Sequence, residues 1–216
     1  QRADEDKRNY ADLAKEFGFD PDAESSKVPL KKVLMAVIKS EFTTEEEKVL
    51  AEKLLQIASD NEHITFRKGL STPGVYSSTN TEQVTIDPRY SSSDYRGATT
   101  PLEVVILHEE IHRRTVESLT KDKEFKTKIE ALRQQATEAY KKLSQAAQKE
   151  IFGDASNKLE YGLKNEAEFI AEVFSNPKFR NFLARIEIKD DITTKNGWEH
   201  FINLILDNLK KILKRP

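Results

Sequence analysis

The sequence predicts a helix-rich α+β protein in which a small sheet precedes a helical second half. Glycine and proline are scarce, with seven of each among 216 residues, so few positions interrupt a regular helix. Strand patterns are confined to residues 63–86, and from Thr100 onward the apolar residues recur at the helical period. Strands and helices that are segregated along the chain are typical of α+β proteins.

The beginning of the chain is expected to form a helical arm, residues 1–42, in front of a domain that spans residues 43–216. A weakly amphipathic helix is predicted over residues 4–17. A polar linker is predicted at residues 20–27, and a second apolar segment covers residues 30–38.

The next segment carries a helix start signal followed by strand patterns. Thr44 and Glu47 have the spacing of a capping box, in which each side chain accepts a hydrogen bond from the other residue's backbone N–H. This signal predicts a helix that runs to about Ser59. Residues 63–66 are expected to form a strand, and residues 74–86 a hairpin with a polar tip.

A second capping box opens the helical half of the chain. It consists of Thr100 and Glu103, with Pro101 at the first helical position. The helix that follows is apolar almost all round, which is typical of a buried helix. Helices are predicted over the rest of the chain, including a long polar one at residues 123–148.

The composition excludes several classes of protein. With 35 Lys and Arg against 37 Asp and Glu, the net charge of -2 argues against a dedicated nucleic-acid-binding protein. The lack of cysteine excludes disulfide scaffolds, thiolate metal sites and a cysteine nucleophile. No apolar run approaches the roughly 20 residues that span a bilayer, so a membrane partner is not expected. The charged beginning at Gln1 is unlike a signal peptide, and we expect a processed product or part of a larger polyprotein.

Residues 108–112, His-Glu-Glu-Ile-His, match the H-E-x-x-H pattern and lie on the predicted buried helix. Histidines four residues apart lie on one helix face, so His108 and His112 can both reach one zinc ion. Glu109 can then accept a proton from a zinc-activated water. The alternative interpretation is that these side chains only form hydrogen bonds in the core or a solvated patch.

A catalytic zinc site needs a third protein ligand and one position left open for water. The two remaining histidines, His63 and His200, stand in settings that favour structural roles, which leaves a carboxylate. A predicted helix that begins at Asn165 carries Glu168 and Glu172 on one face. Taken alone, the residues favour a capping box with Asn165 for Glu168 and ordinary exposure for Glu172.

A family resemblance bears on this choice. Residues 161–174, YGLKNEAEFIAEVF, resemble the third-ligand helix of the gluzincins related to anthrax lethal factor and Pro-Pro endopeptidase. Those enzymes pair H-E-x-x-H with a downstream E-[FY]-x-A-E-x-F helix and a tyrosine seven residues before its first glutamate. The extended string, which continues through NPKF, is also similar to zincin-like domains of large phage polyvalent proteins. The resemblance is close over the two helices and loose over the rest of residues 75–175.

The resemblance implies a zincin-like fold, with a small mixed sheet whose edge strand packs on the H-E-x-x-H helix. It also implies a role for each site residue. Glu109 would be the general base, and Tyr161 would stabilise the oxyanion. Glu172 would accept a hydrogen bond from a ligating imidazole. The zinc ligands that it implies are His108, His112 and Glu168.

Hydrolysis of peptide bonds by a zinc-dependent endopeptidase is therefore the function we expect. An edge strand near Val84–Ile86 is expected to pair with an extended protein or peptide substrate. The alternative is a catalytically silent zincin-fold module that has a binding or structural role, such as phage virion cargo. A silent module should have lost at least one of the catalytic positions, and all are present. The similar proteins are secreted toxins or phage proteins, so the resemblance leaves the localisation open between a phage virion or infected host cell and secretion.

The C-terminal segment, residues 201–216, forms an amphipathic pattern with a basic end. This pattern has two interpretations. The first is a terminal helix packed on the core, with its cations near the negative end of the helix dipole. The second is a helix that binds a membrane surface or an acidic partner. We favour the packed helix.

Overall fold

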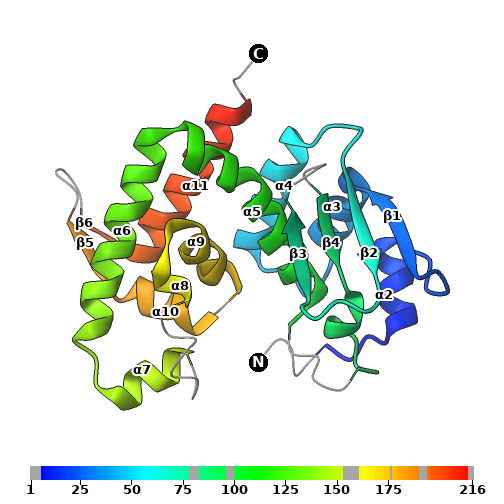
Figure 1. Ribbon diagram of the computed structural model, residues 1–216, viewed down its shortest axis with the longest axis horizontal. Coiled ribbons are helices and arrows are strands. Elements are labelled where there is room, and N and C mark those ends of the chain that lie inside the picture. Colours follow the sequence, from blue (N-terminus) through cyan, green and yellow to red (C-terminus); the bar gives the residue numbers. More distant parts are fainter. Residues whose placement is uncertain are drawn as a thin grey trace. The chain divides into compact units, whose positions relative to one another are not determined.

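The computed structural model describes residues 6–77, 83–95, 100–152, 161–175, 177–189 and 194–213 (Figure 1). These residues form two compact units, Gln1–Arg113 and Arg114–Pro216, and each unit is described by itself. The helix-rich α+β class is confirmed, because a small mixed sheet precedes a mostly helical second half. The division between the units falls after Arg113 and thus differs from the expected boundary after residue 42.

The first unit contains a four-stranded mixed sheet. Its order is β1 (Ser25–Pro29), β2 (His63–Arg67), β4 (Gln83–Ile86) and β3 (Gly74–Ser77). β1 runs antiparallel to β2, β2 parallel to β4, and β4 antiparallel to β3. The predicted strand at residues 63–66 is confirmed, and so are the two antiparallel arms of the predicted hairpin at residues 74–86. The predicted polar tip of this hairpin, residues 78–82, lies outside the described residues.

Two sequence-based expectations about this sheet are wrong. β1 begins inside the stretch expected to be a polar linker, and it joins the supposed helical arm to the sheet through its pairing with β2. Only Val28 of this strand is buried, so its sequence shows no apolar alternation. The strand that contains residues 84–86 is not an edge strand, because β4 pairs with β2 on one side and β3 on the other. The edge strand of the hairpin is β3.

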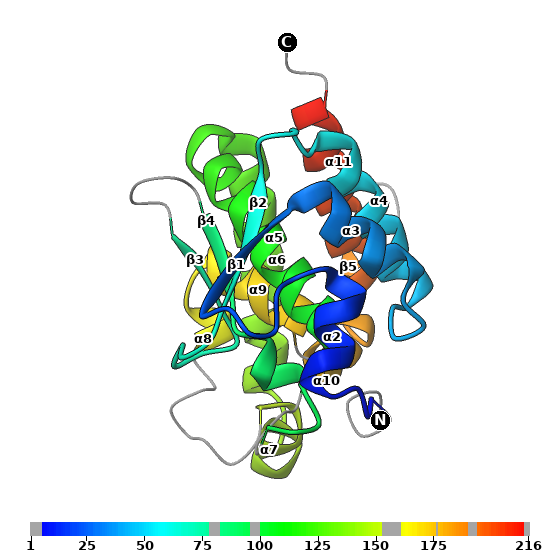
Figure 2. The same cartoon turned by 90° about the vertical axis from the view of Figure 1, so that its right-hand side faces the viewer.

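The helices of the first unit lie on one side of this sheet (Figures 1 and 2). They are α2 (Tyr10–Phe17), α3 (Leu30–Lys39), α4 (Glu45–Ile57) and the first part of α5 (Leu102–Lys121), with a short 3-10 helix, η1 (Pro88–Ser91), after β4. Both hydrogen bonds of the predicted Thr44–Glu47 capping box are present. The core includes Leu13, Phe17, Leu34, Ile64, Ile86 and Ile106, all fully buried.

A buried carboxylate connects the first residues of the chain to the start of α5. Glu103 is fully buried, and both of its oxygens accept hydrogen bonds from Arg8, at 2.8 and 3.0 Å. Ser40 donates a further hydrogen bond to the same carboxylate. The side chain expected to close a capping box with Thr100 is thus used in a tertiary contact. A buried charge requires such partners, so this network fixes the beginning of α5 against α3.

The second unit is mostly helical. Beyond the end of α5, it contains α6 (Lys123–Lys141), α7 (Gln145–Phe152), α8 (Tyr161–Lys164), α9 (Glu166–Ser175), α10 (Pro177–Ala184) and α11 (Gly197–Leu213). The helix predicted over residues 123–148 is divided in two, because Ser144 accepts a hydrogen bond from the backbone N–H of Ala147 and caps a new helix. The prediction of helix throughout is also wrong for β5 (Glu187–Lys189) and β6 (Thr194–Asn196), an antiparallel pair. Three-residue strands are too short to show the alternation of apolar and polar residues that identifies a strand in a sequence.

Aromatic rings form the core of the second unit. Phe169 on α9 contacts Phe179 on α10 and Phe201 on α11, with ring centroids 5.7 and 6.1 Å apart. On α11, Phe201, Ile205 and Leu209 are completely buried. α11 therefore packs on the core of its unit.

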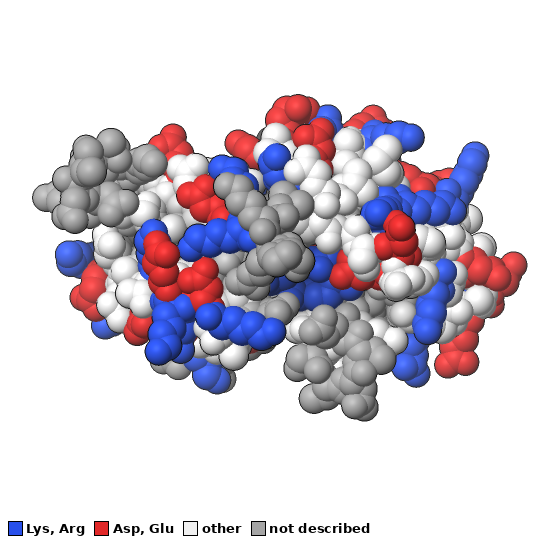
Figure 3. All heavy atoms as spheres, turned by 90° about the horizontal axis from the view of Figure 1, so that it is seen from above, with Lys and Arg blue, Asp and Glu red and all other residues white. Residues whose placement is uncertain are grey.

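The basic end of α11 is paired within the same unit. Lys211 forms ion pairs with Asp122 and Glu124 at the beginning of α6, at 3.3 and 3.2 Å. Lys and Arg are interspersed with Asp and Glu over the face shown in Figure 3. Among the helices of the described residues, none is long and apolar enough to cross a membrane.

Candidate functional site

The two histidines of the H-E-x-x-H pattern lie side by side on α5. Their rings are in an edge-to-face arrangement with centroids 4.9 Å apart. Ile106, Leu107 and Ile111 are almost fully buried, and they hold this part of the helix in the core of the first unit. The side chain of His108 is 21% exposed, and His112 is half-buried. The predicted placement of both imidazoles on one helix face is confirmed.

Burial keeps the imidazole of His112 in its neutral form. Removal from water lowers the pKa of His112 below its ordinary value of 6.5, because burial disfavours the charged imidazolium. The imidazole is therefore neutral at pH 7, as a metal ligand must be. In the metal-free protein this shift makes the free energy of unfolding larger above pH 6.5 than at lower pH. That stability is lost as the pH falls toward the lowered pKa, because the unfolded chain binds the proton first.

Glu109 is buried beside the first histidine. The residue is 7% exposed, and its Oε1 lies 4.0 Å from Nε2 of His108. The beginning of β3 packs directly against it, since a Cβ atom at Gly74 would lie only 2.7 Å from both Cγ and Oε1 of Glu109. Gly74 could not be identified from the sequence, because nothing near a glycine at the start of a strand indicates which helix that strand will contact.

The second glutamate of the pattern has a structural partner. Glu110 is fully buried, and its carboxylate accepts a hydrogen bond from Nη2 of Arg113 at 2.7 Å. The same guanidinium lies 3.6 Å from the carboxylate of Glu62, just before β2. The charge of Glu110 is thereby compensated within the first unit, as burial of a carboxylate requires.

The two candidate carboxylates of the second unit lie one turn apart on α9. The Asn165 side chain accepts a hydrogen bond from the backbone N–H of Glu168 at 2.9 Å, which confirms the predicted N-cap. Phe169, Ile170 and Val173 are fully buried on the core side of this helix. Glu168 and Glu172 are both half-buried, so a single helix face presents them.

Two contacts fix α8 and α9 in their unit. Arg133 on α6 donates to the carboxylate of Glu166 at 3.0 Å and to the carbonyl of Leu163 at 2.7 Å. A Cβ atom at Gly162 would lie 2.6 Å from Cγ of Glu172, so α8 packs directly against this side chain. Tyr161 is the first residue of α8, and its side chain lies outside the described part of the structure.

The candidate residues are divided between the two units. His108, Glu109 and His112 belong to the first unit, whereas Tyr161, Glu168 and Glu172 belong to the second. Over the residues that the structure describes, no group of three or more His, Cys, Asp or Glu side chains is placed to hold a metal ion. Of the other histidines, His63 contacts the carbonyl oxygen of Asn61 through Nδ1 at 2.9 Å.

No protein-family model, no curated protein and no solved structure matches the chain. A function for this chain therefore has to be inferred from the residues of α5 and α9 and from the sequence resemblance.

Proposed function

We propose that this protein is a zinc-dependent endopeptidase with a zincin-like fold. The observation that carries the proposal is the arrangement on α5, where two imidazoles lie side by side and a buried carboxylate lies next to the first of them. A helix that only needed to fill a core would be more stable with apolar side chains at these three positions. The same positions match a pattern whose chemistry requires each of them.

The proposed zinc ligands are His108, His112 and Glu168. Two imidazoles and one carboxylate form a donor set typical of catalytic zinc, in which the fourth position stays open. The lowered pKa of His112 fits this role, because only a neutral imidazole binds the metal. When bound, zinc would supply a water of lowered pKa and a Lewis acid for the scissile carbonyl.

Each remaining residue has a distinct task in the proposed reaction. Glu109 accepts a proton from the attacking water and then donates it to the amine that leaves. The hydroxyl of Tyr161 donates a hydrogen bond to the oxyanion. Glu172 accepts a hydrogen bond from the N–H of a ligating imidazole and so fixes the tautomer of that ring.

The edge strand β3 is the proposed binding surface for an extended peptide substrate. β3 is the last strand in the sheet order, and its residue Val75 is 43% exposed. Its first residue, Gly74, lies against the proposed general base Glu109. A peptide added to this edge would be held by main-chain hydrogen bonds close to that carboxylate. In this role β3 takes the place of the strand at residues 84–86, which was expected from the sequence to be the edge strand that pairs with substrate.

Zinc dependence of cleavage tests the proposal. We expect the full chain to cleave unfolded proteins or a mixed peptide library, to lose this activity on dialysis against a zinc chelator, and to regain it with one equivalent of zinc. Calcium is the control and should not restore cleavage, because imidazole ligands suit zinc and not calcium. Zinc binding without cleavage of any substrate would instead favour the silent module, and failure to bind zinc would contradict both.

The contact between Gly74 and Glu109 gives a second test. In Gly74→Ala the added methyl group displaces the Glu109 carboxylate, because a flexible side chain moves more easily than a paired strand. We expect cleavage to fall by about 10²-fold, the typical cost of misplacing a catalytic group by about 1 Å. Zinc content should not change. The control variant Val49→Ala, on the exposed surface of α4 in the same unit, removes side-chain atoms away from β3 and should stay active. Equal activity in the two variants would contradict the assignment of Glu109.

A further inference from the structure

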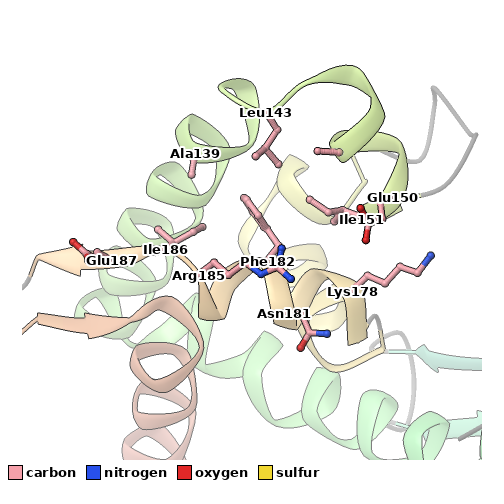
Figure 4. Close-up of a pocket in the computed structure, with 11 residues that line it drawn as sticks. Ala139, Leu143, Glu150, Ile151, Lys178, Asn181, Phe182, Arg185, Ile186 and Glu187 are labelled. Atoms are coloured by element: carbon pink, nitrogen blue, oxygen red, sulfur yellow. The ribbon is translucent and has the colours of Figure 1, made fainter. Parts of the chain in front are cut away.

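A cavity in the second unit is lined by none of the residues proposed for catalysis. Its lining residues come from α6, α7, α10 and the segments that follow α6 and α10 (Figure 4). Its volume is about 430 Å³, which lies within the range of pockets that hold small molecules. None of the residues that line it belongs to the zinc site or to the edge strand β3.

The cavity offers an accessible apolar wall. Leu143 and Ile151 line it from the side of α6 and α7, and Phe182 and Ile186 line it from the side of α10 (Figure 4). Phe182 is buried, whereas the other three side chains are half-buried. An apolar ligand that fills this space would remove their remaining surface from water, which is favourable in proportion to the area covered.

One side of the cavity carries hydrogen-bond donors. Lys178, Asn181 and Arg185 are spaced i, i+3 and i+7, which places them in a row along α10 and the residue that follows it. Arg185 lines the same cavity as Phe182 (Figure 4). Within the described part of the chain, the Arg185 side chain has no hydrogen bond or ion pair. This guanidinium is therefore available to an anionic group at the end of the apolar wall.

Two acidic residues also line the cavity. The carboxylate of Glu187 points away from it in Figure 4. Glu150 lies on α7, across the cavity from α10. An anionic group is therefore favoured at the α10 side, where the donors are, and disfavoured at the α7 side.

We propose that this cavity binds a small amphipathic carboxylate. The apolar body of the ligand lies against Phe182, Ile186 and Leu143, and its carboxylate pairs with the guanidinium of Arg185. The planar fork of an arginine side chain can donate two parallel hydrogen bonds to a carboxylate, which orients the ligand as well as holding it. This proposal does not depend on the proposed peptidase activity.

Isothermal titration calorimetry on the full chain, with decanoate below the concentration at which it forms micelles, tests the proposal. We expect one decanoate per chain, and weaker binding of decyltrimethylammonium, which has the same chain length but the opposite charge. The absence of saturable decanoate binding would overturn the proposal. Tighter binding of the cation would also overturn it, since this would show that Glu150 and not Arg185 selects the ligand.

Matched variants locate the site. Arg185→Gln should weaken decanoate binding by about threefold, the scale of an exposed ion pair, whereas Glu150→Gln should leave it unchanged or strengthen it. Lys142→Gln, which removes a lysine outside the cavity, is the control and should have no effect. Ala147→Leu adds side-chain volume to the lining and should abolish binding while circular dichroism shows an intact fold. Wild-type affinity in both Arg185→Gln and Ala147→Leu would overturn the proposal.

Discussion

Replacing Glu109 with glutamine is expected to reduce peptide cleavage by about 10²–10⁴-fold, the usual contribution of a general base, while the protein keeps its zinc. Glutamine has the shape of glutamate but cannot accept a proton from the attacking water. The side chain is almost fully buried and packed against Gly74, so the substituted amide should occupy the same place. Cleavage rates and the zinc content of the purified variant measure the two parts of this expectation.

Glu46→Gln is the matched control for this experiment. Glu46 is an exposed residue in the first turn of α4, in the same unit, and the substitution removes the same charge. Its activity should equal that of the wild type. Full activity in Glu109→Gln would remove the general-base assignment, whereas loss of zinc in that variant would show that Glu109 acts through the metal site instead.

The second large effect is expected on zinc affinity. Glu168→Gln should weaken zinc binding by more than about 100-fold, because it removes a proposed ligand and even indirect partners of a metal contribute about 10–100-fold. Glu172→Gln should fall within that smaller range, because its carboxylate is proposed to act only through an imidazole. Competition with a chromophoric chelator measures both affinities.

The order of these two effects is the informative result. The backbone of Glu168 remains capped by Asn165 in the variant, so α9 should stay folded. Glu138→Gln, on the exposed surface of α6, is the control for the change in charge. Equal affinities in Glu168→Gln and the control would exclude Glu168 as a ligand, and a larger effect of Glu172→Gln would exchange the two proposed roles.

Features that depend on residues within one or two turns were predictable from the sequence. The capping box of Thr44, the N-cap Asn165 and the shared face of His108 and His112 each follow from a spacing of three or four residues. Such signals are local because the hydrogen bonds of a helix are local. The two helices that carry the proposed site were therefore found at their expected places.

Features that depend on distant partners were not predictable. Glu103 was expected to cap its own helix, but it binds Arg8, which lies 95 residues away. β1 was missed because its pairing with β2, rather than its own polar sequence, makes it a strand. The contact of Gly74 with Glu109 also joins two separate elements. Glu168 was chosen as a ligand because of the family resemblance, since its spacing alone favoured a helix cap.

Zinc-edge X-ray absorption spectroscopy on the zinc-loaded full chain tests the central claim most directly, namely that His108, His112 and Glu168 together bind one zinc ion. We expect one zinc per chain, with scattering from two imidazoles at about 2.0–2.1 Å and from oxygen ligands at about 2.0–2.2 Å. The imidazole signal should be lost in a variant with both histidines replaced, and Glu168→Gln should change the oxygen shell. A spectrum with fewer than two imidazoles, or one that Glu168→Gln leaves unchanged, would contradict the proposed site.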